Sequence, residues 1–131
     1  FEEQRIYFHP EKQYACSFFT MESGYHAMKE LLQKSSNITA VFAMSDVTAI
    51  GAIRAIRDTG LRVPEDISVI GFDGIELGQF MVPKLTTIQQ PGVNIAERCV
   101  KILVQCIQKK KTAVREQIPF SMIAGESTRS L

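Results

Sequence analysis

An aspartate and a serine–aspartate pair, each placed directly after an apolar stretch, are the side chains best positioned to do chemistry. Asp73 follows the stretch 67–72, and Ser45 and Asp46 follow the stretch 38–44. Apolar stretches of this length are typical of buried strands, and the ligands of an open parallel sheet bind beyond the carboxyl ends of its strands. These three side chains are therefore candidates to form hydrogen bonds with a small ligand.

Both aspartates also have a structural interpretation. Asp46 falls in the first turn of a predicted helix, where the helix dipole favours a carboxylate and Ser45 supplies the cap, and we favour this role over ligand contact. Asp73 precedes Gly74, and an Asp-Gly pair is common where a strand must turn. The spacing alone leaves Asp73 undecided between a turn former and a hydrogen-bond acceptor for a ligand.

The elements that position these residues alternate between amphipathic helices and apolar strands. Apolar residues recur at helical spacing in 21–35 and in 46–60, and the second helix closes on Gly60, a typical left-handed C-cap. The strands at 38–44 and 67–72 are expected to be covered on both faces. Short connections between them are typical of a parallel sheet with crossover helices, so we predict an α/β fold. The rest of the chain is predicted to form a loop or short helix at 74–85, a strand at 86–90, a long helix at 93–110 and a last strand at 117–125.

Composition and charge argue against several other classes of protein. Lys and Arg total 15 against 14 Asp and Glu, so no broad basic surface is available to bind nucleic acid. No stretch approaches the roughly 18 apolar residues of a membrane span. His9 and His26 have no cysteine or carboxylate at ligand spacing, and the sequence contains no nucleophile elbow or phosphate-binding loop. We expect no catalytic site, no metal, no cofactor and no membrane partner.

The cysteines indicate a reducing compartment. The chain has 3 of them, and Cys99 and Cys106 lie on one predicted helix about 10 Å apart along its axis. This separation is too large for a disulfide, so we predict reduced, buried thiols and a cytoplasmic protein. The sequence begins at Phe1 within a stretch unlike a terminal tail, and we expect it to be a fragment of a longer protein.

Three blocks of sequence occur in close succession. They are AMSDVTAIGAIRAIRDTGLRVPEDI at 43–67, VPEDISVIGFDG at 63–74 and PKLTTIQQP at 83–91. Together they resemble the effector-binding core of the lactose-repressor (LacI/GalR) family of bacterial transcription regulators. The resemblance extends over 18–128, which is most of the chain.

The resemblance implies a type I periplasmic-binding-protein-like fold. Such regulators carry an N-terminal helix-turn-helix that binds DNA, followed by two α/β subdomains with a sugar or other small effector between them. We expect 1–90 to form most of the C-terminal subdomain, 91–116 to cross over and place its helix in the N-terminal subdomain, and 117–131 to supply the final strand and tail. The parallel sheet with its flanking helices is thus expected to be an incomplete version of this fold.

Four residues match positions that contact the effector in the family. Asp73 matches an acidic residue that accepts hydrogen bonds from effector hydroxyls, which an ionised carboxylate can bridge. Phe19 matches an aromatic residue that lies against the sugar ring, with Phe18 as an alternative occupant and core packing as the structural alternative. Ser45 matches a polar position often held by asparagine. Gln90 lies at the crossover and could reach the cleft, and a hinge role is equally expected.

The resemblance also implies a homodimer, whose interface maps to Ile50, Phe80 and Met81. The segment 79–82 (QFMV) is unusually apolar for a connecting loop, which supports an interface. Its structural alternative is a loop that packs on its own core.

The predicted function is that of the ligand-sensing and dimerisation region of a DNA-binding regulator. Effector binding between the subdomains would favour one of their relative orientations and so alter the affinity for operator DNA. The alternative is an extracytoplasmic sugar-binding protein of a transporter, which shares the fold. An upstream helix-turn-helix would support the regulator, and an upstream signal peptide would support the transporter component.

Overall fold

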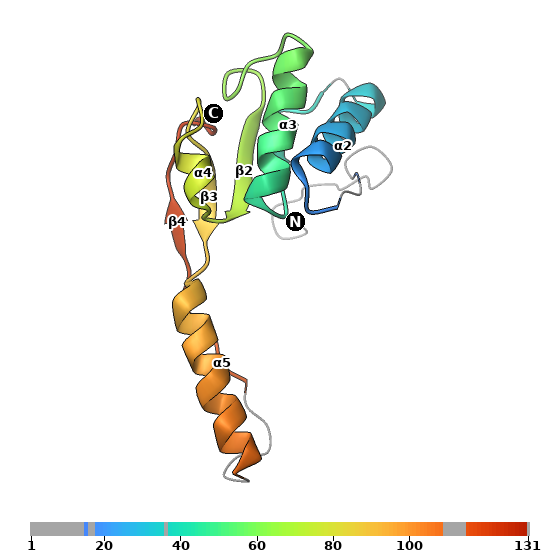
Figure 1. Ribbon diagram of the computed structural model, residues 1–131. Coiled ribbons are helices and arrows are strands. Elements are labelled where there is room, and N and C mark those ends of the chain that lie inside the picture. The colour runs from blue at the N-terminus through green and yellow to red at the C-terminus, as the bar shows by residue number, and fades with distance from the viewer. Residues whose placement is uncertain (1–14, 16–17, 36, 109–114, 131) are drawn as a thin grey trace, which may run out of the picture.

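The computed structural model describes residue 15 and residues 18–35, 37–108 and 115–130. Among these residues the chain forms a sheet, helices that pack against it and one helix that extends away from it (Figure 1). The helices are α2 (Met21–Lys34), α3 (Asp46–Asp58), α4 (Glu76–Gln79) and α5 (Gly92–Ile107). The strands are β1 (Ala40–Phe42), β2 (Ser68–Asp73), β3 (Thr86–Gln89) and β4 (Ser121–Ile123).

The sheet has the strand order β1-β2-β3-β4, and its first three strands are parallel. This confirms the predicted α/β fold with a parallel sheet. The edge strand β4 pairs with β3 in the antiparallel direction, because the chain returns to the sheet after α5. The register pairs Asp73 at the end of β2 with Gln89 at the end of β3, so the two strands finish at the same level.

Helices α2 and α3 form where a capping residue directly precedes an apolar stripe at helical spacing. The side chain of Thr20 accepts a hydrogen bond from the backbone N–H of Ser23, which caps α2. The helices pack closely, and a Cβ added at Gly51 of α3 would overlap the backbone oxygen of Met21 in α2. Helix α3 lies against the sheet and α2 lies on its outer side (Figure 1). The largest apolar side chains buried in this core are Met28, Ile53, Ile56, Ile67, Leu85 and Val69.

The strand predicted at 38–44 is shorter and more exposed than expected. Only Ala40–Phe42 forms β1, and the side chains of Phe42 and Met44 are 57% and 70% exposed. The expectation that both faces are covered is wrong for this strand, because α3 covers one face of the sheet and α2 packs on α3 instead of on the opposite face. The left-handed C-cap at Gly60 is confirmed, since its φ is 83°.

Helix α5 has a different environment from the other long helices. It extends from the end of β3 away from the sheet (Figure 1), and none of its residues is buried. Cys99 is exposed and Cys106 is half-buried, so the expectation of buried thiols is wrong for this pair, although both are free as predicted. Cys16 lies outside the described residues. None of the helices within the described residues is long and apolar enough to cross a membrane.

Candidate functional site

One end of the sheet collects most of the predicted ligand-binding residues. The carboxyl ends of β2 and β3 and the beginnings of α2, α3 and α5 all lie at this end (Figure 1). Asp73 ends β2, Ser45 caps α3, Phe19 comes just before the cap of α2, and Gln90 follows β3. In open parallel sheets, ligands bind beyond the carboxyl ends of the strands, so a ligand is expected at this end.

Asp73 has the backbone conformation of a turn and a carboxylate that is only half-buried. Its φ of 126° lies in a region that side chains other than glycine rarely adopt, and Gly74 follows with a φ of 77°. Such strain costs about 1–3 kcal/mol, and it persists where the surrounding structure enforces it, often at functional sites. The turn predicted from the Asp-Gly pair is confirmed. It turns the chain away from the sheet and leaves the Asp73 side chain beside Gln90.

Gln90 holds the carboxylate of Asp73. Its side-chain amide Nε2 donates a 2.7 Å hydrogen bond to Asp73 Oδ1, and its backbone N–H donates to the backbone oxygen of Asp73 at 3.2 Å. Asp73 Oδ2 accepts no hydrogen bond from the described residues. A carboxylate can accept further hydrogen bonds at both oxygens. Asp73 and Gln90 therefore present a hydrogen-bond acceptor at the carboxyl end of the parallel strands.

Asp46 has a role that neither sequence interpretation included. Its side chain is fully buried, so it has no surface with which to contact a ligand, and the cap of α3 is supplied by Ser45. Asp46 Oδ2 accepts hydrogen bonds of 2.8 Å from the backbone N–H groups of both Gly74 and Ile75, and its Oδ1 accepts one from the hydroxyl of Thr87. The carboxylate therefore fastens the turn after Asp73 to α3 and β3.

The other two predicted contacts differ in exposure. Ser45 is buried, and its hydroxyl accepts a 3.2 Å hydrogen bond from the backbone N–H of Thr48 and lies 3.0 Å from the Thr48 hydroxyl. Its side chain is thus engaged within the first turn of α3. Phe19 is 73% exposed and Phe18 is 82% exposed, so neither ring is a core residue. Core packing, the structural alternative for Phe19, is therefore excluded.

The crossover forms a shallow groove beside Gln90. It is lined by the segments 89–94 and 119–121, and its volume is about 500 Å³. Both segments lie between α5 and the sheet, so the groove lies at the junction of the helix with the strands. Gln90 therefore borders both Asp73 and this connection.

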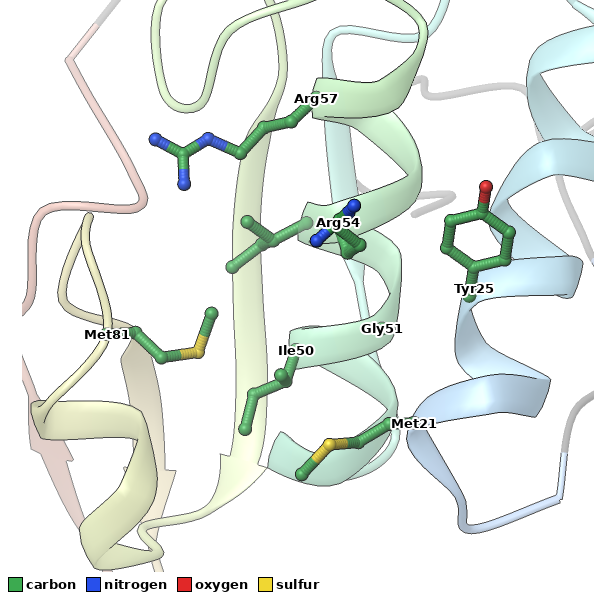
Figure 2. A pocket seen from close by; sticks show the side chains of 8 residues that line it. Met21, Tyr25, Ile50, Gly51, Arg54, Arg57 and Met81 are labelled. Carbon is green, nitrogen blue, oxygen red and sulfur yellow. The ribbon is translucent and has the colours of Figure 1, made fainter.

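A second groove lies on the outer side of α3, away from Asp73. It has a volume of about 410 Å³ and is lined mostly by apolar groups, with arginine at one end (Figure 2). Two of the three predicted interface residues, Ile50 and Met81, face each other across it, whereas Phe80 is not part of its lining and is 77% exposed. Its lining residues are Met21, Tyr25, Ile50, Gly51, Ile53, Arg54, Arg57 and Met81.

Polar contacts fix the walls of this groove. Asp58 accepts a 2.8 Å bond from Arg54 Nε and a 3.2 Å bond from the hydroxyl of Tyr25 in α2. Arg57 donates a 2.8 Å bond to the backbone oxygen of Val82, which ties the loop after α4 to α3. Sequence reasoning missed Tyr25 and both arginines, because helical spacing shows which face is apolar but not which distant loop closes the groove over it.

Comparison with known proteins defines the class of the fold. Residues 1–128 match the periplasmic binding protein-like domain, and the chain belongs to this family. The curated HTH-type transcriptional repressor PurR of Pasteurella multocida (strain Pm70) is 44% identical over 115 residues, which is 86% of this chain and 34% of the relative. The chain thus spans about a third of the length of the curated relatives it matches.

Solved structures narrow the class further. The complex of the transcriptional regulator CelR with cellobiose is 35% identical, with a TM-score of 0.80 over 85% of this chain and 34% of that chain. The lac repressor dimer bound to operator and the anti-inducer ONPF is 32% identical, with a TM-score of 0.81 over 87% of this chain and 40% of that chain. The predicted resemblance is confirmed: the chain is similar in sequence and fold to the effector-binding core of LacI/GalR-type regulators.

Proposed function

We propose that this chain senses a small effector, a sugar or sugar derivative, for a bacterial DNA-binding regulator. The observation that carries the proposal is the half-buried carboxylate of Asp73. Gln90 holds it in a strained turn at the carboxyl end of the parallel strands. A carboxylate in this position can accept hydrogen bonds from two adjacent hydroxyls. The related CelR was solved with cellobiose, which is rich in such groups.

The remaining predicted contacts complete the site in different ways. The exposed ring of Phe19 supplies an apolar face for the C–H groups of a sugar ring. Gln90 orients the carboxylate of Asp73 and is available to the ligand from the crossover. Ser45 contributes by fixing the start of α3, because its hydroxyl is already bonded to Thr48. No step of this function requires turnover, a cofactor or a metal.

The mechanism requires a second subdomain opposite this one. We propose that the segment 91–116 belongs to that subdomain, that 1–90 forms most of the subdomain with Asp73, and that 117–131 returns as the final strand and tail. The apolar residues exposed on α5 support this division. An effector that binds Asp73 and the opposite subdomain would favour one orientation and shift the population that binds operator DNA. Contact with DNA would come from a helix-turn-helix elsewhere in a longer cytoplasmic protein.

We further propose that a second copy of the chain packs against the groove on α3. Ile50 and Met81 would form the apolar centre of this interface, with Phe80 exposed beside it. An exposed phenylalanine next to an apolar groove is typical of an association surface. The lac repressor, which has the same fold, was solved as a dimer.

Sedimentation of the complete gene product tests the dimer. Ile50→Glu places a charge in the centre of the groove, and we expect it to shift the protein from dimer to monomer at micromolar concentration. Leu61→Glu is the matched control, because Leu61 is an exposed apolar residue outside this groove. A dimer unaffected by Ile50→Glu would contradict this interface.

A transporter sugar-binding protein remains the alternative function. It would use the same carboxylate and the same type of cleft, so the site alone does not separate the two. The repressor PurR and the regulator CelR favour a regulator. The upstream part of the gene decides between them, because a helix-turn-helix and a signal peptide are easily distinguished.

Calorimetry on the complete gene product tests the effector site. Cellobiose, lactose and ribose, which are bound in related solved structures, serve as probes. Asp73→Asn is the deciding variant because asparagine has the shape of aspartate and, like aspartate, is among the residues most often found at positive φ. We expect affinity for the bound sugar to fall by about 10- to 100-fold, as for loss of hydrogen bonds to a charged group. Glu76→Gln, an exposed carboxylate three residues away, is the control and should bind normally. Unchanged affinity in Asp73→Asn would contradict the site.

A further inference from the structure

Asp46 is the only charged side chain that is buried among the described residues, and the proposed effector contacts do not use it. A buried carboxylate is costly unless it is fully hydrogen-bonded. Here all three partners are donors: the backbone N–H groups of Gly74 and Ile75 and the hydroxyl of Thr87. This donor set matches an ionised carboxylate, which only accepts hydrogen bonds.

The strand beside Asp46 is shaped to accommodate the carboxylate. Gly71 lies inside β2, and a Cβ at this position would overlap Asp46 Oδ1. Glycine weakens a strand interior, so its presence there marks a position where another group must approach closely. Because Gly71 has no side chain, the Asp46 carboxylate fits against β2 at this position.

The bonds of Asp46 converge on the two segments that hold Asp73. Gly74 and Ile75 directly follow Asp73, and fixing their N–H groups fixes the turn in which Asp73 has its φ of 126°. Thr87 lies in β3, the strand that leads to Gln90, and Gln90 binds the carboxylate of Asp73. Asp46 therefore holds the segment after Asp73 and the strand that leads to Gln90, while its own side chain stays buried and away from the proposed ligand.

We propose that Asp46 is a positioning residue that holds the strained turn at Asp73 and so orients the Asp73 carboxylate for ligand binding. The ligand-binding part of this inference rests on the proposed function of Asp73. The hold of Asp46 on the turn stands on the contacts of Asp46 alone. The two parts therefore need separate measurements.

The experiment compares Asp46→Ala and Asp46→Asn in the complete gene product. Hydrogen exchange at the amides of Gly74 and Ile75 and a crystal structure of each variant report on the turn. In Asp46→Ala we expect exchange at both amides to accelerate at least about tenfold, because their acceptor is gone. We also expect Asp73 to leave the positive-φ region. Asp46→Asn keeps one oxygen acceptor for the two N–H groups and should rescue most of the protection.

Two further variants keep the result interpretable. Asp58→Ala removes an exposed carboxylate from the same helix and should leave exchange at Gly74 unchanged. Thr87→Val removes only the donor to Asp46 Oδ1, so it reports on the clamp should Asp46→Ala fail to fold. Unchanged exchange and an unchanged Asp73 turn in the folded Asp46 variants would overturn the proposal.

Calorimetry with cellobiose, lactose and ribose then separates this inference from the proposed function. If the wild type binds a sugar, we expect at least about tenfold weaker binding in Asp46→Ala and partial recovery in Asp46→Asn. Faster exchange with unchanged sugar affinity would show a purely structural role and overturn the positioning claim. If the wild type binds none of these sugars, or if Asp73→Asn binds normally, the proposed function fails, while exchange and the crystal structures still decide whether Asp46 holds the turn.

Discussion

Helices α3 and α5 are both amphipathic, yet they have opposite environments. Eight of the 13 residues in α3 are buried, whereas none of the 16 residues in α5 is buried. The partners of α3 are the neighbouring elements α2 and β2, which are close in sequence. The apolar face of α5 carries exposed Val100 and Leu103, which are both 60% exposed. Helical periodicity thus predicts an apolar face but not where its partner is.

The same contrast separates the two halves of the proposed mechanism. The compact region built on α3 contains the turn at Asp73, the Asp46 clamp and the groove with Ile50. The crossover leads out of this region at Gln90, and α5 follows without a covering element among the described residues. The region around α3 is therefore packed within the described residues, whereas we propose that the apolar face of α5 is covered by a partner outside them.

Glycine substitutions should give the largest difference between the regions. Gly51→Ala introduces a Cβ that overlaps the backbone of α2, and we expect it to lower the free energy of unfolding by about 3 kcal/mol. Gly92→Ala at the start of α5 has no heavy atom within 4 Å of the new Cβ and should change it by less than about 0.5 kcal/mol. Urea unfolding measures both variants. Similar losses of unfolding free energy would contradict the difference in packing between α3 and α5.

Removal of one methyl group should give a smaller difference. Ile53 is 1% exposed, and we expect Ile53→Val to cost about 1 kcal/mol of unfolding free energy because it leaves a small cavity. Ile107 on α5 is 71% exposed, so Ile107→Val deletes the same group from the surface and should be close to neutral. Chemical denaturation of the two variants in parallel is the measurement. A loss at Ile107 as large as that at Ile53 would show that α5 is already packed.

The smallest expected effect is a pH dependence at the connection before β2. Hydrogen bonds from the Arg62 side chain and backbone hold the pKa of Asp66 below its ordinary value. Because the folded pKa is the lower one, this stabilisation is present above the unfolded pKa of about 3.9 and is lost as the pH falls through the folded value. The side chain of Arg62 is 69% exposed and that of Asp66 is 32% exposed, so solvent screens the pair and the gain in stability is small.

Asp66→Asn removes this titration. The unfolding midpoint of the variant should lie slightly below that of the wild type at pH 7, and the difference should vanish toward pH 2. Glu65→Gln, an exposed neighbour, serves as the control. A difference that grows at low pH would show that the sign of this linkage is wrong.

The local features of the fold could be predicted from the sequence, but the long-range contacts could not. The helices around 21–35 and 46–60, the C-cap at Gly60 and the turn at Asp73 follow from residue types that act on near neighbours. The partners of Asp46 lie 28, 29 and 41 residues away, and no local pattern identifies them. A glycine inside an apolar strand, here Gly71, was the one signal of a close approach.

The site shows the same limit. Asp73 and Gln90 are brought together because β2 and β3 pair in parallel, with Asp73 opposite Gln89. The sequence predicted both strands but not that they are neighbours in the sheet. Ser45 matched a ligand-contacting position, yet its hydroxyl is engaged by Thr48, because a serine at a helix start caps the helix. Residue type alone does not show whether a polar side chain is free to bind a ligand, as at Asp73, or is engaged in a helix cap, as at Ser45.

The most direct test is amide hydrogen exchange of α3 and α5, measured both in this 131-residue chain and in the complete gene product. We expect exchange in α5 to be at least about 100-fold slower in the complete product, where its apolar face would be covered, while exchange in α3 changes by less than about threefold. Equal protection of α5 in both proteins would contradict the claim that its partner lies outside this chain.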